Sequence, residues 1–144
     1  MKPILFLAAL LLTLSLTSAA QDHGSVTFNG QTITFTGYRT RYSDQKRWII
    51  AEGKKDGKLY SVTVTLTPDV TKESTIKTDA THTVTLTVSN LDYSAAQNHC
   101  FDGGSTVMVK PQGTQFTASG KDMQSGNCFG KSSGSDKLSF TMKP

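Results

Sequence analysis

Residues 25–36, SVTFNGQTITFT, carry the strongest structural signal in this chain. Apolar and polar residues alternate on both sides of Asn29-Gly30, a dipeptide that accepts the positive φ angles of a tight two-residue turn. A loop of this length pairs Val26 with Ile33. The stretch therefore predicts a β-hairpin whose threonines face solvent and whose buried face carries four large apolar residues: Val26, Phe28, Ile33 and Phe35.

The same alternation extends from this hairpin to the end of the chain. Strands are predicted over further segments, at residues 46–51, 58–67, 83–89, 106–110, 114–119 and 137–143. In the first of them the pattern predicts that Trp48 and Ile50 point inward. The polar stretches 69–81 and 90–105 are predicted to be loops. About eight short antiparallel strands without a long amphipathic helix favour a single all-β domain, a β-sandwich, with a small β-barrel as the alternative.

The first twenty residues have the features of a cleaved signal peptide. Lys2 precedes an apolar run over residues 4–16, and Ser18-Ala19-Ala20 provides small residues for cleavage. The run is too short for a comfortable membrane span. We expect residues 1–20 to be removed, 21–24 to be a short flexible tail, and 25–144 to form the domain, so the mature protein is secreted or periplasmic without a membrane span.

The net charge of the mature chain limits the class of partner that we expect, and its two cysteines predict a covalent link. Only Lys2 leaves with the signal peptide, so 14 basic and 11 acidic residues remain, a net charge of +3 with His neutral. An excess this small in an exported protein does not favour a nucleic-acid partner. Cys100 and Cys128 are the only cysteines, and in an oxidising compartment the pair predicts one disulfide.

A basic and aromatic stretch over residues 37–48, GYRTRYSDQKRW, is the first candidate for a binding surface. On a strand, Tyr38 and Tyr42 share one face, and Arg39 and Arg41 share the other. Together with Trp48, these side chains can stack on sugars or hold anionic polymers. The alternative is that the aromatic rings cover the edge of the core, while the charges stay in water and keep an edge strand from pairing.

The mature N-terminus is a candidate metal site. Cleavage before Gln21 exposes the tripeptide Gln21-Asp22-His23. Its α-amine, two deprotonated amides and the imidazole can surround Cu(II) with four nitrogens in a plane. Cyclisation of Gln21 or cleavage at another bond would remove the site, and the alternative is an unliganded tail.

Motifs for catalysis are weak. His99-Cys100 resembles a thiol site, but a catalytic thiolate must be unoxidised. The three histidines have no zinc-ligand spacing. We therefore expect no catalytic residues and no cofactor other than copper at the tail. The sequence favours a non-enzymatic module that binds an envelope, glycan or protein partner, and can act as an inhibitor. The alternatives are a Cu(II)-binding protein and a hydrolase with an unrecognised site.

Overall fold

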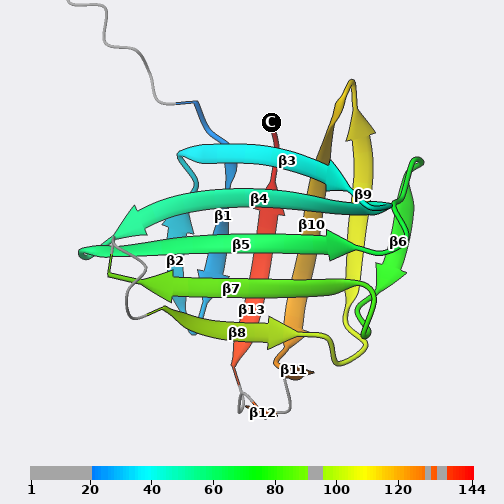
Figure 1. Cartoon of the computed structure of the whole chain (residues 1–144). Helices are drawn as coiled ribbons and strands as arrows, with labels where there is room; N and C mark the ends of the chain where they lie inside the picture. The colour runs from blue at the N-terminus through cyan, green and yellow to red at the C-terminus, as the bar shows by residue number, and fades with distance from the viewer. Residues whose placement is uncertain (1–20, 91–95, 129–130, 133–135) are drawn as a thin grey trace, which may run out of the picture.

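The protein is a β-sandwich of two antiparallel sheets, as the sequence pattern predicts. A computed structural model describes residues 21–90, 96–128, 131–132 and 136–144. The predicted signal peptide, residues 1–20, lies outside the described residues. Figure 1 shows the five-stranded sheet in front, with its strands running across those of the six-stranded sheet behind it. The two sheets are separate, so the structure is a sandwich and not the alternative barrel.

Thirteen strands form within the described residues, compared with about eight predicted. The six-stranded sheet has the order β2-β1-β13-β10-β9-β6. Its strands are β1 (Gly24–Phe28), β2 (Gln31–Thr34), β6 (Ser74–Lys77), β9 (Thr106–Gln112), β10 (Gln115–Gln124) and β13 (Lys137–Met142). The five-stranded sheet has the order β3-β4-β5-β7-β8. Its strands are β3 (Gly37–Ser43), β4 (Lys46–Lys55), β5 (Lys58–Leu66), β7 (Thr83–Ser89) and β8 (Gln97–Phe101). Two short strands, β11 (Asn127–Cys128) and β12 (Lys131–Ser132), pair with each other.

The hairpin predicted over residues 25–36 is confirmed in its register. Val26 pairs with Ile33 in β1 and β2, and Asn29 and Gly30 have φ angles of 47° and 80°. Positive φ at both central residues fits the right-handed twist of the paired strands. The core between the sheets contains the inward side chains predicted for this hairpin, together with alternate apolar side chains of β5, β7 and β13.

The prediction for residues 46–51 was wrong in its register. Ile49 and Ala51 enter the core, whereas Trp48 is half-buried on the outer face of β4, where Ile50 also lies outside the core cluster. The inward face of β4 continues as Ala51 and Gly53, and at Gly53 the backbone of β2 leaves no space for a Cβ atom. An inward face built from small residues gives a weaker apolar alternation than the outward face does.

Two segments predicted as loops contain edge strands. β6 lies within residues 69–81 and pairs with β9, and β8 lies within residues 90–105 and pairs with β7. Each strand adds one apolar side chain to the core or its edge. Ile76 of β6 packs against the core, and Phe101 of β8 lies within it. Short edge strands with one or two apolar residues give almost no period-2 signal.

Cys100 lies on β8 and is fully buried. It is not a free thiol. The Gly126 N–H donates to the Cys100 carbonyl oxygen at 2.8 Å, so the chain two residues before Cys128 already runs beside Cys100. The Cys128 side chain lies outside the described part of the structure, and the Cys100–Cys128 disulfide stays a prediction.

The described part of the chain holds no helix with the length and apolar character that a membrane span requires.

Candidate binding surface on strands β3 and β4

The candidate binding residues lie on β3 and β4, the outermost hairpin of the five-stranded sheet. Asp44 and Gln45 form its two-residue turn with φ angles of 51° and 61°. Aspartate is one of the few side chains that tolerates this region at low cost. The turn sets the register of the hairpin and places Arg41 directly opposite Trp48.

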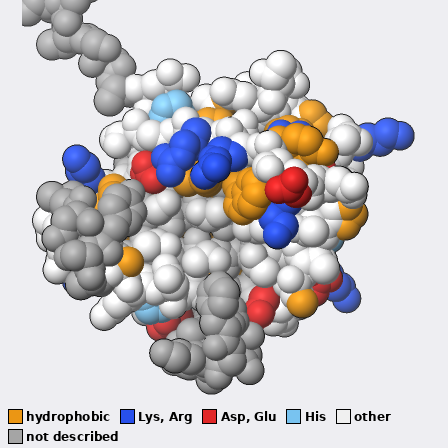
Figure 2. All heavy atoms as spheres, viewed as in Figure 1, with side chains coloured by type: hydrophobic (Ala, Val, Ile, Leu, Met, Phe, Trp, Pro, Cys, Tyr) orange, Lys and Arg blue, Asp and Glu red, His pale blue; other side chains and the backbone are white. Residues whose placement is uncertain are grey.

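The outer face of this hairpin holds a group of charged side chains around one indole. The Arg41 guanidinium carbon and the Lys46 Nζ each lie 5.9 Å from the centre of the Trp48 ring. Both distances are within the range of a cation–π interaction. Arg39 and Glu52 lie on the same face, and we call these five residues the Trp48 patch. Figure 2 shows Lys and Arg side chains gathered beside hydrophobic side chains over β3 and β4.

The Trp48 patch has an excess of positive charge. Arg39 Nη2 lies 2.9 Å from Glu52 Oε1, and the Arg39 side chain is 52% exposed. An exposed ion pair of this kind stabilises the fold by roughly 0–1 kcal/mol and is easily exchanged for another partner. Arg41 and Lys46 carry the remaining charge at the rim of the indole. The arrangement can therefore contact an apolar ring surface and an anionic group at the same time.

Tyr38 does not belong to this surface. Its ring packs against the core, and its hydroxyl donates to the Phe116 carbonyl oxygen on β10. The Phe116 N–H donates back to the Tyr38 hydroxyl oxygen at 3.3 Å. Burial raises the pKa of Tyr38 above its ordinary value, and the bond to Phe116 opposes part of this effect. Tyr38 therefore connects the two sheets, which agrees with the alternative of aromatic rings covering the core edge.

Tyr42 is 58% exposed, but it lies on the opposite face of β3 from the Trp48 patch. The Arg47 guanidinium carbon lies 5.2 Å from the Tyr42 ring centre and 4.2 Å from that of Phe116. Arg47 Nε and Nη2 donate to the two carboxylate oxygens of Asp69 at 2.7 and 2.8 Å. This bidentate, largely buried pair holds Arg47 in place as a structural residue.

Two of the three candidate copper residues at the N-terminus, Asp22 and His23, contact the sandwich. The backbone N–H of His23 donates to the Phe35 carbonyl oxygen at 3.4 Å, and its ring Nδ1 lies 3.1 Å from the Lys143 carbonyl oxygen. Lys143 also holds the pKa of Asp22 below its ordinary value, with a smaller effect from the Gly24 N–H. β1 begins at Gly24, within the range expected to be a tail. Copper binding through Gln21, Asp22 and His23 stays a prediction, and it would have to displace both His23 contacts.

Of the other two histidines, His99 has the closer acidic neighbour. His99 Nδ1 lies 2.6 Å from Asp136 Oδ2 at the end of the sandwich, and the Phe28 ring lies 4.8 Å from the His99 ring. Asn29 Nδ2 donates to the other oxygen of Asp136 at 3.0 Å. Among the described residues, no group of three or more His, Cys, Asp or Glu side chains is placed to hold a metal ion. The hydrolase alternative stays a prediction.

The structure thus brings together three of the five candidate binding residues, Arg39, Arg41 and Trp48. It adds Lys46 and Glu52, which strand alternation would have placed with Trp48 if the outward register of β4 had been recognised. Comparison with known proteins finds no matching family model, no matching curated protein and no matching solved structure. The chemistry of the surface itself is therefore the basis for inferring a function.

Proposed function

We propose that this chain is an exported, non-enzymatic binding module whose Trp48 patch holds an acidic glycan of a cell envelope or cell surface. The observation that carries the proposal is one indole flanked by Arg41 and Lys46 on the exposed face of a sheet. A sugar ring offers an apolar face of C–H groups to the indole, and its acidic substituent pairs with the neighbouring cations.

The location of the patch supports recognition by a rigid surface. β4 pairs along its length with both β3 and β5, so the backbone beneath Trp48 is fixed before any ligand arrives. A preformed surface loses less conformational entropy on binding than a mobile loop does. The Arg39 side chain is 52% exposed beside Glu52, so an acid on the ligand can add a contact to its guanidinium.

Binding to an acidic polysaccharide tests this proposal. Polygalacturonate is the acidic probe and dextran is the neutral one, and calorimetry measures the affinity of each. We expect the double variant Arg39→Ala/Arg41→Ala and the single variant Trp48→Ala each to weaken polygalacturonate binding about tenfold or more, as anchor residues do at other interfaces.

The matched control removes two charges elsewhere. Lys54 and Lys58 are exposed near the turn at the other end of the β4–β5 hairpin, and Lys54→Ala/Lys58→Ala should keep most of the affinity. Equal losses in both double variants would mean a diffuse electrostatic attraction instead of a site. Full affinity in the Arg39/Arg41 variant would exclude the Trp48 patch as the binding site for polygalacturonate. If the protein captured a protein partner and bound no polysaccharide, an acidic glycan would be excluded as the ligand of the patch.

A further inference from the structure

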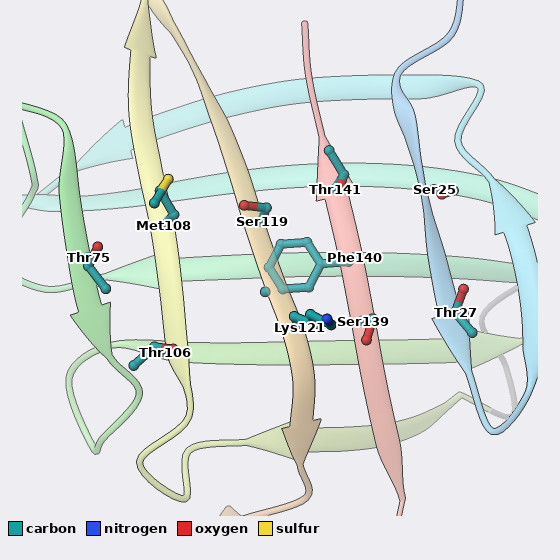
Figure 3. A pocket seen from close by; sticks show the side chains of 11 residues that line it. Ser25, Thr27, Thr75, Thr106, Met108, Ser119, Lys121, Ser139, Phe140 and Thr141 are labelled. Atoms are coloured by element: carbon teal, nitrogen blue, oxygen red, sulfur yellow. The ribbon is translucent and has the colours of Figure 1, made fainter.

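The outer face of the six-stranded sheet carries rows of hydroxyl side chains that run across the strands. Ser25 on β1 pairs with Thr141 on β13, and Thr141 pairs with Ser119 on β10. The row continues through Met108 on β9 to Thr75 on β6. Figure 3 shows these five side chains on five adjacent strands. The sheet order therefore assembles one continuous surface from segments that are far apart in the sequence.

This surface is hollowed where β10 bulges. The register between β10 and β13 shifts between Gly120 and Met123, and Gly120 and Phe140 line the hollow there. The hollow has a volume of about 480 Å³, which lies in the range of small-ligand sites. A bulge re-aims the side chains beside it. Here it places Lys121 at the hollow (Figure 3).

The lining offers hydrogen-bond donors and positive charge. The Asp122 N–H donates to the Ser139 hydroxyl oxygen at 2.9 Å, which leaves the hydroxyl hydrogen of Ser139 available to another acceptor. None of the described residues that line the hollow is acidic. Lys121 is exposed, and Lys77 lies opposite Thr106 in the next cross-strand row. The charge of this face therefore favours an anion.

An apolar contact lies beside these polar groups. Met108 is 42% exposed at the hollow, one of two large apolar side chains that the described residues leave so open. Its thioether is polarisable and adapts to the shape of a neighbouring group. A ligand that fits this lining has hydroxyl groups for the serines and threonines, C–H groups for Met108 and an anionic group for Lys121.

We infer that the hollow is a second binding site, for a sugar unit that bears a carboxylate or a sulfate. It lies on the opposite face of the sandwich from the Trp48 patch and shares no residue with it. The site does not depend on the function proposed for the patch, because its own hydroxyls, cation and apolar contact define the ligand. Neutral sugars should bind more weakly, since they leave Lys121 without a partner.

Amide NMR of the full-length mature protein tests the site directly. The probes are trigalacturonate, a sulfated trisaccharide and the neutral trisaccharide maltotriose. We expect either acidic probe to shift the amide signals of Ser119, Lys121 and Thr141, and we expect maltotriose to require about tenfold higher concentration or more. Both acids acting equally would indicate recognition of charge, and a preference for one would identify the acid.

Two variants separate the hollow from the patch. Ser119→Phe fills the hollow and should abolish these shifts, while any shifts at Arg41 and Trp48 persist. Lys121→Gln leaves the hollow open and should lower the affinity for the acidic probes alone, with Lys54→Gln as the charge-matched control. The inference is wrong if no probe shifts the hollow signals, or if Lys121→Gln and Lys54→Gln weaken acidic binding equally. Loss of patch shifts alone would contradict the proposed function and leave this site intact.

Discussion

Asp79 shows how one exposed carboxylate organises a turn. Its Oδ1 accepts hydrogen bonds from the Thr81 hydroxyl at 2.6 Å, from the Thr81 N–H at 2.7 Å and from the His82 N–H at 2.8 Å. The Thr81 hydroxyl, followed by the two backbone donors, holds the pKa of Asp79 well below its ordinary value of 3.8. These bonds fix the connection between β6 and β7.

This depressed pKa predicts a specific acid sensitivity. The folded state favours the ionised carboxylate, so Asp79 contributes stability above the ordinary pKa of 3.8 and loses it as the pH falls below that value. Asp79→Asn keeps an acceptor but cannot ionise. We expect the variant to unfold at lower urea concentration than the wild type at neutral pH, and the difference to shrink in acid. A difference that stayed constant from neutral pH to about pH 2.5 would contradict this role.

At the scale of elements, β2 of one sheet packs closely against β4 of the other. A Cβ atom added at Gly53 would lie 2.2 Å from the Thr34 carbonyl oxygen, a distance that real structures do not tolerate. Gly53→Ala therefore requires the strands to separate, and we expect a loss of about 1–3 kcal/mol in the free energy of unfolding, measured with urea. Gly37→Ala is the matched control, because its Cβ would meet nothing closer than 3.9 Å. Equal stability of the two variants would show that β2 does not lie this close.

The same packing explains which strands could be predicted from the sequence. β5, β7 and β13 bury every second residue with large apolar side chains, and their alternation is unambiguous. β4 turns Ala51 and Gly53 inward to make room for β2, so its more apolar face is the outer one. β6 and β8 are held mainly by pairing with a neighbouring strand, which leaves no alternation in their own sequence.

At the scale of the whole molecule, the predicted disulfide would connect the two layers. Cys100 lies on β8 of the five-stranded sheet, and the segment after β10 of the six-stranded sheet reaches it through the Gly126–Cys100 backbone bond. Closing the loop between residues 100 and 128 is expected to contribute roughly 3–4 kcal/mol by restricting the unfolded chain. Cys100→Ser/Cys128→Ser should therefore lower the melting temperature, as should reductant on the wild type. Reductant should not affect the double variant, and an unchanged melting temperature would exclude the bond.

The two proposed sites differ in how far the sequence could reveal them. Arg39, Arg41 and Trp48 are close in the chain, so strand alternation and one turn are enough to bring them together. The hollow combines side chains of β1, β6, β9, β10 and β13. The threonines of the hairpin at residues 25–36 were predicted to face solvent, but only the order of the strands makes the side chains of the hollow neighbours. Because the two sheets pack inner face to inner face, the two surfaces point away from each other.

The position of β13 has a consequence for the time at which the fold can form. β13 lies between β1 and β10. Among the described strands of that sheet, β1 pairs with β13 on one side and with β2 on the other. Until β13 has been synthesised, the β1–β2 hairpin and the β10-β9-β6 strands cannot join into one sheet. Gly24, for example, pairs with Met142, which is made 118 residues later. Contacts this distant in sequence form slowly. A chain that has been synthesised only as far as β10 therefore lacks its completed core, and its β1–β2 hairpin can join the sheet only after β13 has been made.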